Sequence, residues 1–201
     1  MINHKKKFLY THYPKCGGTT VRSYFLNNYA EGIDEEIEDV SNRHCSLTFT
    51  LNCINKKNFN TEDYYKFSFA RNPFSLCVSF YIYNKTNLYE SLKSRSLPIH
   101  KEISFCLNNS FKDYVYSDFC KSYFDEIYMH EGQIMIDQIL KQETLQKDFD
   151  ILCSKLNLKH TNLELINTTN HKNYRRYYDI ESIKVVEEKF NKELNLFNYC
   201  F

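Results

Sequence analysis

Hydrophobic and polar residues switch between two repeat patterns near the start of this chain. Residues 7–12, KFLYTH, form a short run of apolar and aromatic side chains that is typical of a buried strand. In residues 19–30 the apolar positions instead recur every four residues, with Val21, Phe25 and Tyr29 on one face. The pattern therefore predicts a strand, a turn and then a helix.

The same order recurs further along the chain. Residues 64–70, YYKFSFA, alternate as a strand does. Asn72 is a good N-cap, and Pro73 at the first helical position has its φ angle already set for a helix. An apolar stripe follows at Leu76, Phe80 and Tyr83. A second strand is thus predicted to lead directly into a second helix.

Further helices are predicted in the second half of the chain. Residues 111–124 have inward apolar positions, residues 144–158 are strongly amphipathic, and residues 179–197 form a closing helix capped by Asp179. Residues 84–132 otherwise show little periodicity. Strands that feed helices favour an α/β fold with a central parallel β-sheet flanked by helices.

Composition narrows the class of protein. The 201 residues are 42% hydrophobic with no linker-like tract, which favours one domain spanning 1–201. The charges nearly cancel at +1, so we expect no nucleic-acid partner. The beginning of the chain has no signal-peptide pattern, and no apolar run could span a membrane. We therefore expect a cytoplasmic protein whose eight cysteines are reduced and mostly buried.

The first strand-to-helix turn, THYPKCGGTT, holds two of only four glycines. Glycines let the backbone wrap closely around an anion, and the amides and dipole of a helix N-terminus attract negative charge. A lysine adds a full charge and two threonines add hydroxyl donors. The predicted anion site comprises Lys15, Cys16, Gly17, Gly18, Thr19 and Thr20. The alternative is a plain tight turn with a surface lysine.

The order of residues differs from that of an ordinary ATP-binding loop. The Walker A pattern places its lysine after the glycines, whereas Lys15 precedes Gly17 and Gly18. No apolar strand ends in an aspartate that could hold Mg²⁺. A kinase using ATP is therefore one alternative function, and a non-catalytic nucleotide-binding protein is another.

The second turn carries its own anion-binding groups. Arg71 lies at the predicted end of a strand and can grip a phosphate with two hydrogen bonds, and Ser79 adds a hydroxyl two helical turns later. Adjacent parallel strands end at the same edge of a sheet. The two turns together predict a ligand with two separate anionic groups.

The two turns, PKCGGTTVRSYF and FSFARNPFSLCVSFY, resemble the cosubstrate motifs of the sulfotransferases that use 3′-phosphoadenosine 5′-phosphosulfate (PAPS). The resemblance is strongest to the carbohydrate branch (heparan 2-O, chondroitin and dermatan types) and small bacterial relatives. Residues 136–158 and 174–199 are similar to later parts of that family. Two departures are the stretch FSLC, where the family usually has another basic residue, and the absence of tryptophan.

The resemblance implies a P-loop-like fold, PAPS as cosubstrate, adenosine 3′,5′-bisphosphate (PAP) as product, no metal, and a hydroxyl acceptor that is a carbohydrate. The first turn would hold the 5′-phosphosulfate, with Lys15 catalytic. Arg71 and Ser79 would hold the 3′-phosphate. A late basic loop would close over the nucleotide, with His171, Lys172 and Arg175 as candidates.

Sulfuryl transfer also needs a base for the acceptor proton. The carbohydrate branch places a catalytic histidine between its two motifs, and His44 occupies that interval. The competing carboxylates are Glu31, Asp34 and Glu35, in a run that otherwise reads as a solvated face. His12, at the end of the first strand, is expected to pack or to orient Lys15.

Overall fold

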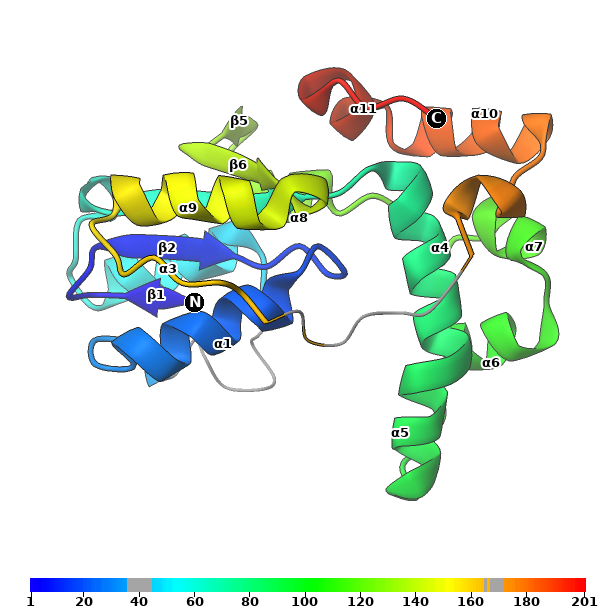
Figure 1. The fold of residues 1–201 in the computed structure, drawn as a ribbon, viewed down its shortest axis with the longest axis horizontal. Coiled ribbons are helices and arrows are strands. Elements are labelled where there is room, and N and C mark those ends of the chain that lie inside the picture. The colour runs from blue at the N-terminus through cyan, green and yellow to red at the C-terminus, as the bar shows by residue number, and fades with distance from the viewer. Residues whose placement is uncertain (36–44, 165, 167–171) are drawn as a thin grey trace. The chain divides into compact units, whose positions relative to one another are not determined.

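The computed structural model describes residues 1–35, 45–164, 166 and 172–201 (Figure 1). Its contacts divide the chain into two compact units. The first comprises Met1–Arg71 with Tyr123–Asn167, and the second comprises Asn72–Ser122 with Thr168–Phe201.

The first unit is built on a four-stranded sheet in the order β1-β2-β3-β6. β2 is parallel to β3 and β3 is parallel to β6, whereas β1 is antiparallel to β2. The parallel sheet and both predicted strands are confirmed, and β1 and β6 were not predicted. The strands span Ile2–Asn3 (β1), Phe8–Thr11 (β2), Tyr65–Ala70 (β3) and Gln138–Lys141 (β6).

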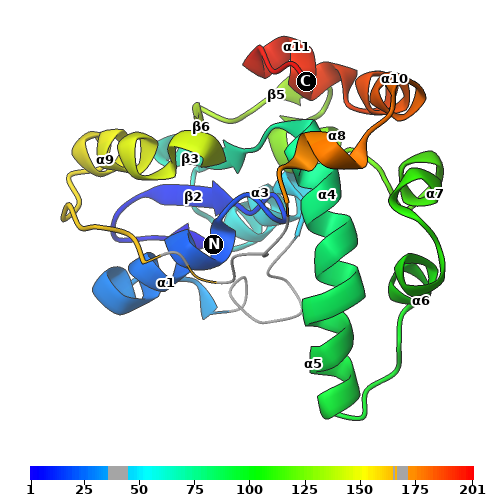
Figure 2. The same ribbon diagram turned by 45° about the vertical axis from the view of Figure 1, so that its right-hand side comes forward.

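Helices cover both faces of this sheet (Figures 1 and 2). α1 (Gly18–Tyr29) and α9 (Leu145–Lys155) share one face, where Phe25 lies 4.5 Å from Phe8 between ring centroids. α3 (Leu47–Lys56) covers the other face, where Leu9 joins the apolar side chains of that helix. Because Phe8 and Leu9 are adjacent in a strand, their side chains point to opposite faces and both are fully buried.

Shorter elements complete the first unit. Single 3₁₀ turns occupy Thr61–Asp63 and Gln142–Thr144. α8 (Phe124–Tyr128) leads into a hairpin of β4 (Met129–His130) and β5 (Gln133–Ile134). The buried Tyr128 hydroxyl donates to the carbonyl of Phe69 at 3.1 Å, which ties α8 to the sheet.

The regular elements in the described part of the second unit are all helices. α4 (Pro73–Tyr83) begins as predicted, because the Asn72 side chain accepts from the Phe74 amide at 3.0 Å and proline occupies the first turn. A π-helical turn, Asn84–Leu88, continues it into α5 (Tyr89–Ser94). The other elements are α6 (Lys101–Asn108), α7 (Phe111–Tyr116), a 3₁₀ turn (Tyr174–Tyr177), α10 (Ile180–Lys189) and α11 (Asn191–Phe197).

Two of the predicted helices are shorter than their patterns suggested. α7 ends at Tyr116 because Ser117 is extended and its hydroxyl bonds the Tyr114 carbonyl and the Phe119 amide instead of continuing the helix. The closing helix is capped by Asp179 as predicted but breaks at Phe190, which is 2% exposed. Burial of the Phe190 ring is therefore favoured over continuation of the helix through this position.

All eight cysteines are free, and six of them are buried, as expected. Only Cys200 is exposed and Cys45 is half-buried.

Candidate functional site

The turn between β2 and α1 is built from left-handed backbone. Lys15 has φ 65° and Gly17 has φ 84°, and α1 begins at Gly18. Glycine adopts such angles without strain, whereas lysine does so at some cost. Because the turn follows β2, Lys15 and the start of α1 lie at the carboxyl edge of the sheet, where a helix N-terminus favours an anion.

Gly18 is required for a different reason. A Cβ atom built at this position would lie 1.8 Å from Nε2 of His12, whose ring is buried beneath the start of α1. Its ring also stacks at 5.9 Å on that of Tyr10. His12 therefore packs, as expected, and the contact explains why a second glycine follows Gly17.

The structure brings Lys15 and Arg71 together. They follow the adjacent parallel strands β2 and β3, and Nη1 of Arg71 donates to the Lys15 carbonyl at 3.0 Å. Burial, and next the positive charge of Arg71, lower the pKa of Lys15 from its ordinary 10.5 to about 8. A bound anion would offset both effects, so this edge of the sheet is electrostatically suited to one.

The two threonines of the turn differ in their surroundings. Thr19 is exposed. Thr20 is only 3% exposed, and its Oγ1 accepts a hydrogen bond from the Ile166 amide at 3.0 Å. Sequence reasoning treated them as equivalent, and nothing in the sequence signalled the contact with Ile166.

The remaining predicted residues are distributed over the chain. Cys16 is buried beside Lys15. Ser79 is fully buried on α4 in the second unit, and Lys172 is exposed there. His44 and His171 lie outside the described residues.

Asp34 is not the solvated residue that its sequence context suggested. Its carboxylate is buried, and it accepts from Lys57 Nζ at 2.6 Å and pairs with His4 Nε2 at 3.0 Å. His4 Nδ1 in turn lies 2.6 Å from the hydroxyl of Tyr64. His4 follows β1 and Tyr64 precedes β3, so this network lies at the amino edge of the sheet, opposite Lys15. Asp34 is therefore a structural anchor and a poor candidate for the base.

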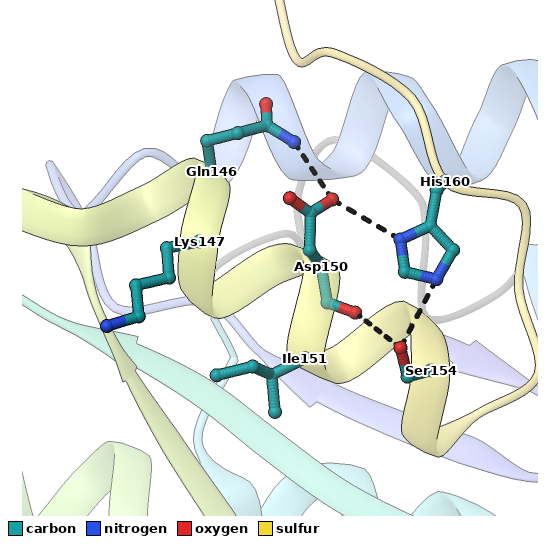
Figure 3. A pocket seen from close by; sticks show the side chains of 6 residues that line it. All are labelled: Gln146, Lys147, Asp150, Ile151, Ser154 and His160. Atoms are coloured by element: carbon teal, nitrogen blue, oxygen red, sulfur yellow. Dashed lines mark hydrogen bonds and ion pairs between the residues drawn. The ribbon is translucent and has the colours of Figure 1, made fainter.

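A Ser–His–Asp arrangement, formed by Ser154 and Asp150 of α9 and by His160 of the segment that follows, lines an open groove of about 580 Å³ (Figure 3). His160 Nε2 is 3.2 Å from Ser154 Oγ, and its Nδ1 is 3.5 Å from Asp150 Oδ1. The Ser154 hydroxyl, however, donates to the Asp150 backbone carbonyl at 3.1 Å, so its hydrogen is not directed at His160. The neighbouring amides belong to the helix and offer no oxyanion hole. The arrangement fastens a loop to α9 and does not form a nucleophile.

Within the described ranges, no cluster of three or more His, Cys, Asp or Glu side chains is placed to hold a metal ion. In the same part of the chain, no helix has the length and apolar character needed to cross a bilayer.

Comparison with known proteins is consistent with this geometry. The model of the Sulfotransferase family matches residues 1–200, which is nearly the whole chain. Neither the curated proteins nor the solved structures contain a match. Sulfotransferases are transferases that move a sulfuryl group to an acceptor. By the extent of the family match, this chain belongs to the sulfotransferase family.

Proposed function

We propose that this sulfotransferase takes its sulfuryl group from PAPS and transfers it to a hydroxyl of a carbohydrate. The observation that carries the choice of donor is the contact between Lys15 and Arg71 at the carboxyl edge of the parallel sheet. Two cations meet there beside a helix N-terminus, an arrangement that favours a multiply charged anion.

The residues of the turn have complementary tasks in this chemistry. The acceptor oxygen forms a bond to sulfur while the bond from sulfur to the bridging oxygen breaks, and PAP leaves with the negative charge. Lys15 stabilises that developing charge, and Thr19 and the first amides of α1 donate to the non-bridging oxygens. Gly17 and Gly18 allow the backbone to approach closely.

The nucleotide and the acceptor need further groups. We assign the 3′-phosphate to Arg71 and Ser79, with Lys172 closing over the nucleotide. We assign the role of base to His44 from the resemblance to the carbohydrate branch. Glu31 and Glu35 are the competing carboxylates, whereas Asp34 is held at the other edge of the sheet by Lys57. The carbohydrate acceptor follows from the resemblance of the two turns to the carbohydrate branch.

Calorimetry and turnover test the proposal. PAP should bind without any divalent cation and more tightly than ATP with Mg²⁺, and sulfur-labelled PAPS should label a carbohydrate acceptor. Lys147→Ala serves as the control for loss of a lysine, because Lys147 is exposed on α9 and lies outside the proposed site. Tighter binding of ATP with Mg²⁺ would favour a kinase. Binding of PAP with no transfer to any acceptor in a broad carbohydrate panel would favour the non-catalytic alternative.

A further inference from the structure

The segment that follows α9, residues 159–164 with 166, runs alongside α1, and we refer to it as the strap (Figures 1 and 2). Two tyrosines of α1 hold its beginning. The Lys159 amide donates to the Tyr29 hydroxyl at 2.7 Å, and the Tyr24 hydroxyl donates to the Lys159 carbonyl. Both contacts lie toward the C-terminal half of α1, away from the anion turn.

The middle of the strap is held by a single side chain of α9. Nε2 of Gln146 donates to the Thr161 carbonyl at 3.0 Å, and its Oε1 accepts from the Leu163 amide at 2.8 Å. Nε2 also contacts Asp150 Oδ1 at 3.1 Å, which fixes the orientation of the amide group. Gln146 thus bonds the strap backbone as a neighbouring strand would.

The end of the strap reaches the anion turn. The Ile166 amide donates to Oγ1 of Thr20, next to Thr19 in the first turn of α1. Ile166 is 40% exposed, and of the strap's described residues only Leu163 is half-buried. Hydrogen bonds rather than apolar burial therefore hold the strap in place. Segments of this kind open at low free-energy cost.

We propose that Thr20 and Gln146 are positioning residues of the anion site, and that they couple the strap to ligand binding. The bond from Ile166 braces the first turn of α1, whose amides and Thr19 hydroxyl meet the ligand. In this role Thr20 acts through the strap, because its Oγ1 accepts the bond from Ile166. This inference rests on the proposed function, since PAP is the ligand whose affinity reports the bracing.

Coupling between two sites is reciprocal, so two readouts are available. If the strap strengthens PAP binding, PAP must protect the Ile166 amide from hydrogen exchange by the same factor. Loss of one neutral hydrogen bond changes an equilibrium constant about fivefold. We expect Thr20→Val, which keeps the shape but loses the acceptor, to raise the Kd of PAP about fivefold and to speed exchange at Ile166. Thr20→Ser should restore both.

A double-mutant cycle separates bracing from direct contact. Gln146→Leu alone should raise the Kd of PAP by a similar factor, and the double variant Thr20→Val/Gln146→Leu should be little weaker than either single one. Lys147→Ala, one residue along the exposed part of α9, should change neither Kd nor exchange. The measurements are PAP titrations by calorimetry and exchange of the Ile166 amide by NMR.

Several outcomes would overturn the proposal. Multiplicative losses in the double variant would mean that Thr20 and Gln146 act independently, with Thr20 contacting the ligand. Unchanged exchange at Ile166 in Thr20→Val would mean that the strap is held without it. Failure of the wild-type chain to bind PAP would instead contradict the proposed function. Exchange at the Ile166 amide in the unliganded variants would still test whether Thr20 and Gln146 hold the strap. Should Thr20→Val not fold, Gln146→Leu supports or contradicts the coupling by the same two readouts.

Discussion

Removal of the Lys15 charge should stabilise the unliganded protein while abolishing its affinity for the nucleotide. The pKa of Lys15 falls from 10.5 to about 8, because burial strips water from the ammonium group and Arg71 repels it. In Lys15→Met the apolar stem of the side chain remains and both unfavourable effects vanish. A residue that weakens the fold at a ligand site is the pattern expected where function takes precedence over stability.

The magnitude follows from the difference of 2.5 pKa units between 10.5 and 8. At 1.36 kcal/mol per unit this gives about 3.4 kcal/mol, and partial exposure of the side chain reduces it to roughly 2 kcal/mol. The folded state binds fewer protons than the unfolded state between pH 8 and 10.5. The penalty is therefore fully present below pH 8 and disappears as the pH rises through this window.

Urea unfolding at pH 7 and at pH 10.5 measures the effect. At pH 7 we expect Lys15→Met to be more stable than the wild type by roughly 2 kcal/mol, and at pH 10.5 the two should nearly coincide. Lys147→Met controls for loss of an exposed lysine and should show no such dependence. In the same samples PAP should stabilise the wild type at pH 7 and leave Lys15→Met almost unchanged.

Binding should show the same proton linkage. A bound phosphate raises the pKa of Lys15, so binding above pH 8 takes up a proton and the affinity for PAP should fall as the pH rises. Equal or lower stability of Lys15→Met at pH 7, or a stability difference that does not shrink at high pH, would refute the reasoning. Either result would mean that Lys15 is not held as an unfavourable charge.

Four further changes test other parts of the site and fold. Gly18→Ala should destabilise the protein by about 3 kcal/mol because its Cβ would strike His12, and His12→Ala in the same chain should restore part of the loss, as thermal unfolding would show. Arg71→Ala should weaken PAP binding far more than binding of the analogue without the 3′-phosphate, and equal losses in calorimetry would remove Arg71 from that role. Asp34→Ala should cost about 3 kcal/mol in urea unfolding and leave the Kd of PAP unchanged, since it breaks a buried pair at the far edge of the sheet. His44→Ala should lower turnover roughly 100-fold at constant PAP affinity, and a near-normal rate would exclude His44 as the base.

The strand-to-helix turns were predictable because local chemistry determines them. Asn72 and Pro73 specify a helix start by side-chain capping and a fixed φ angle, and the structure has both. Gly17 likewise marks a left-handed residue. These features depend on a few neighbouring residues, which a single sequence contains in full.

Long-range contacts could not be inferred in the same way. β6 was missed because its sequence, QILK, is half polar and becomes a strand only by pairing with β3. Asp34 resembled a solvated acid among its neighbours, and only the distant Lys57 and His4 explain its burial. The contact of Thr20 with Ile166 spans 146 positions and leaves no local signal.

The two edges of the sheet differ in their electrostatic design. At the amino edge, opposite charges meet, since Lys57 lies 2.6 Å from the Asp34 carboxylate, which His4 also contacts at 3.0 Å, and such a network stabilises the fold without any ligand. At the carboxyl edge, Arg71 instead lies close enough to Lys15 to lower its pKa. Like charges held together in a folded protein oppose folding unless an anion joins them. Binding of an anion there would recover the stability lost at the carboxyl edge, which supports our proposal that this edge, and not the groove on α9, recognises the anionic cosubstrate.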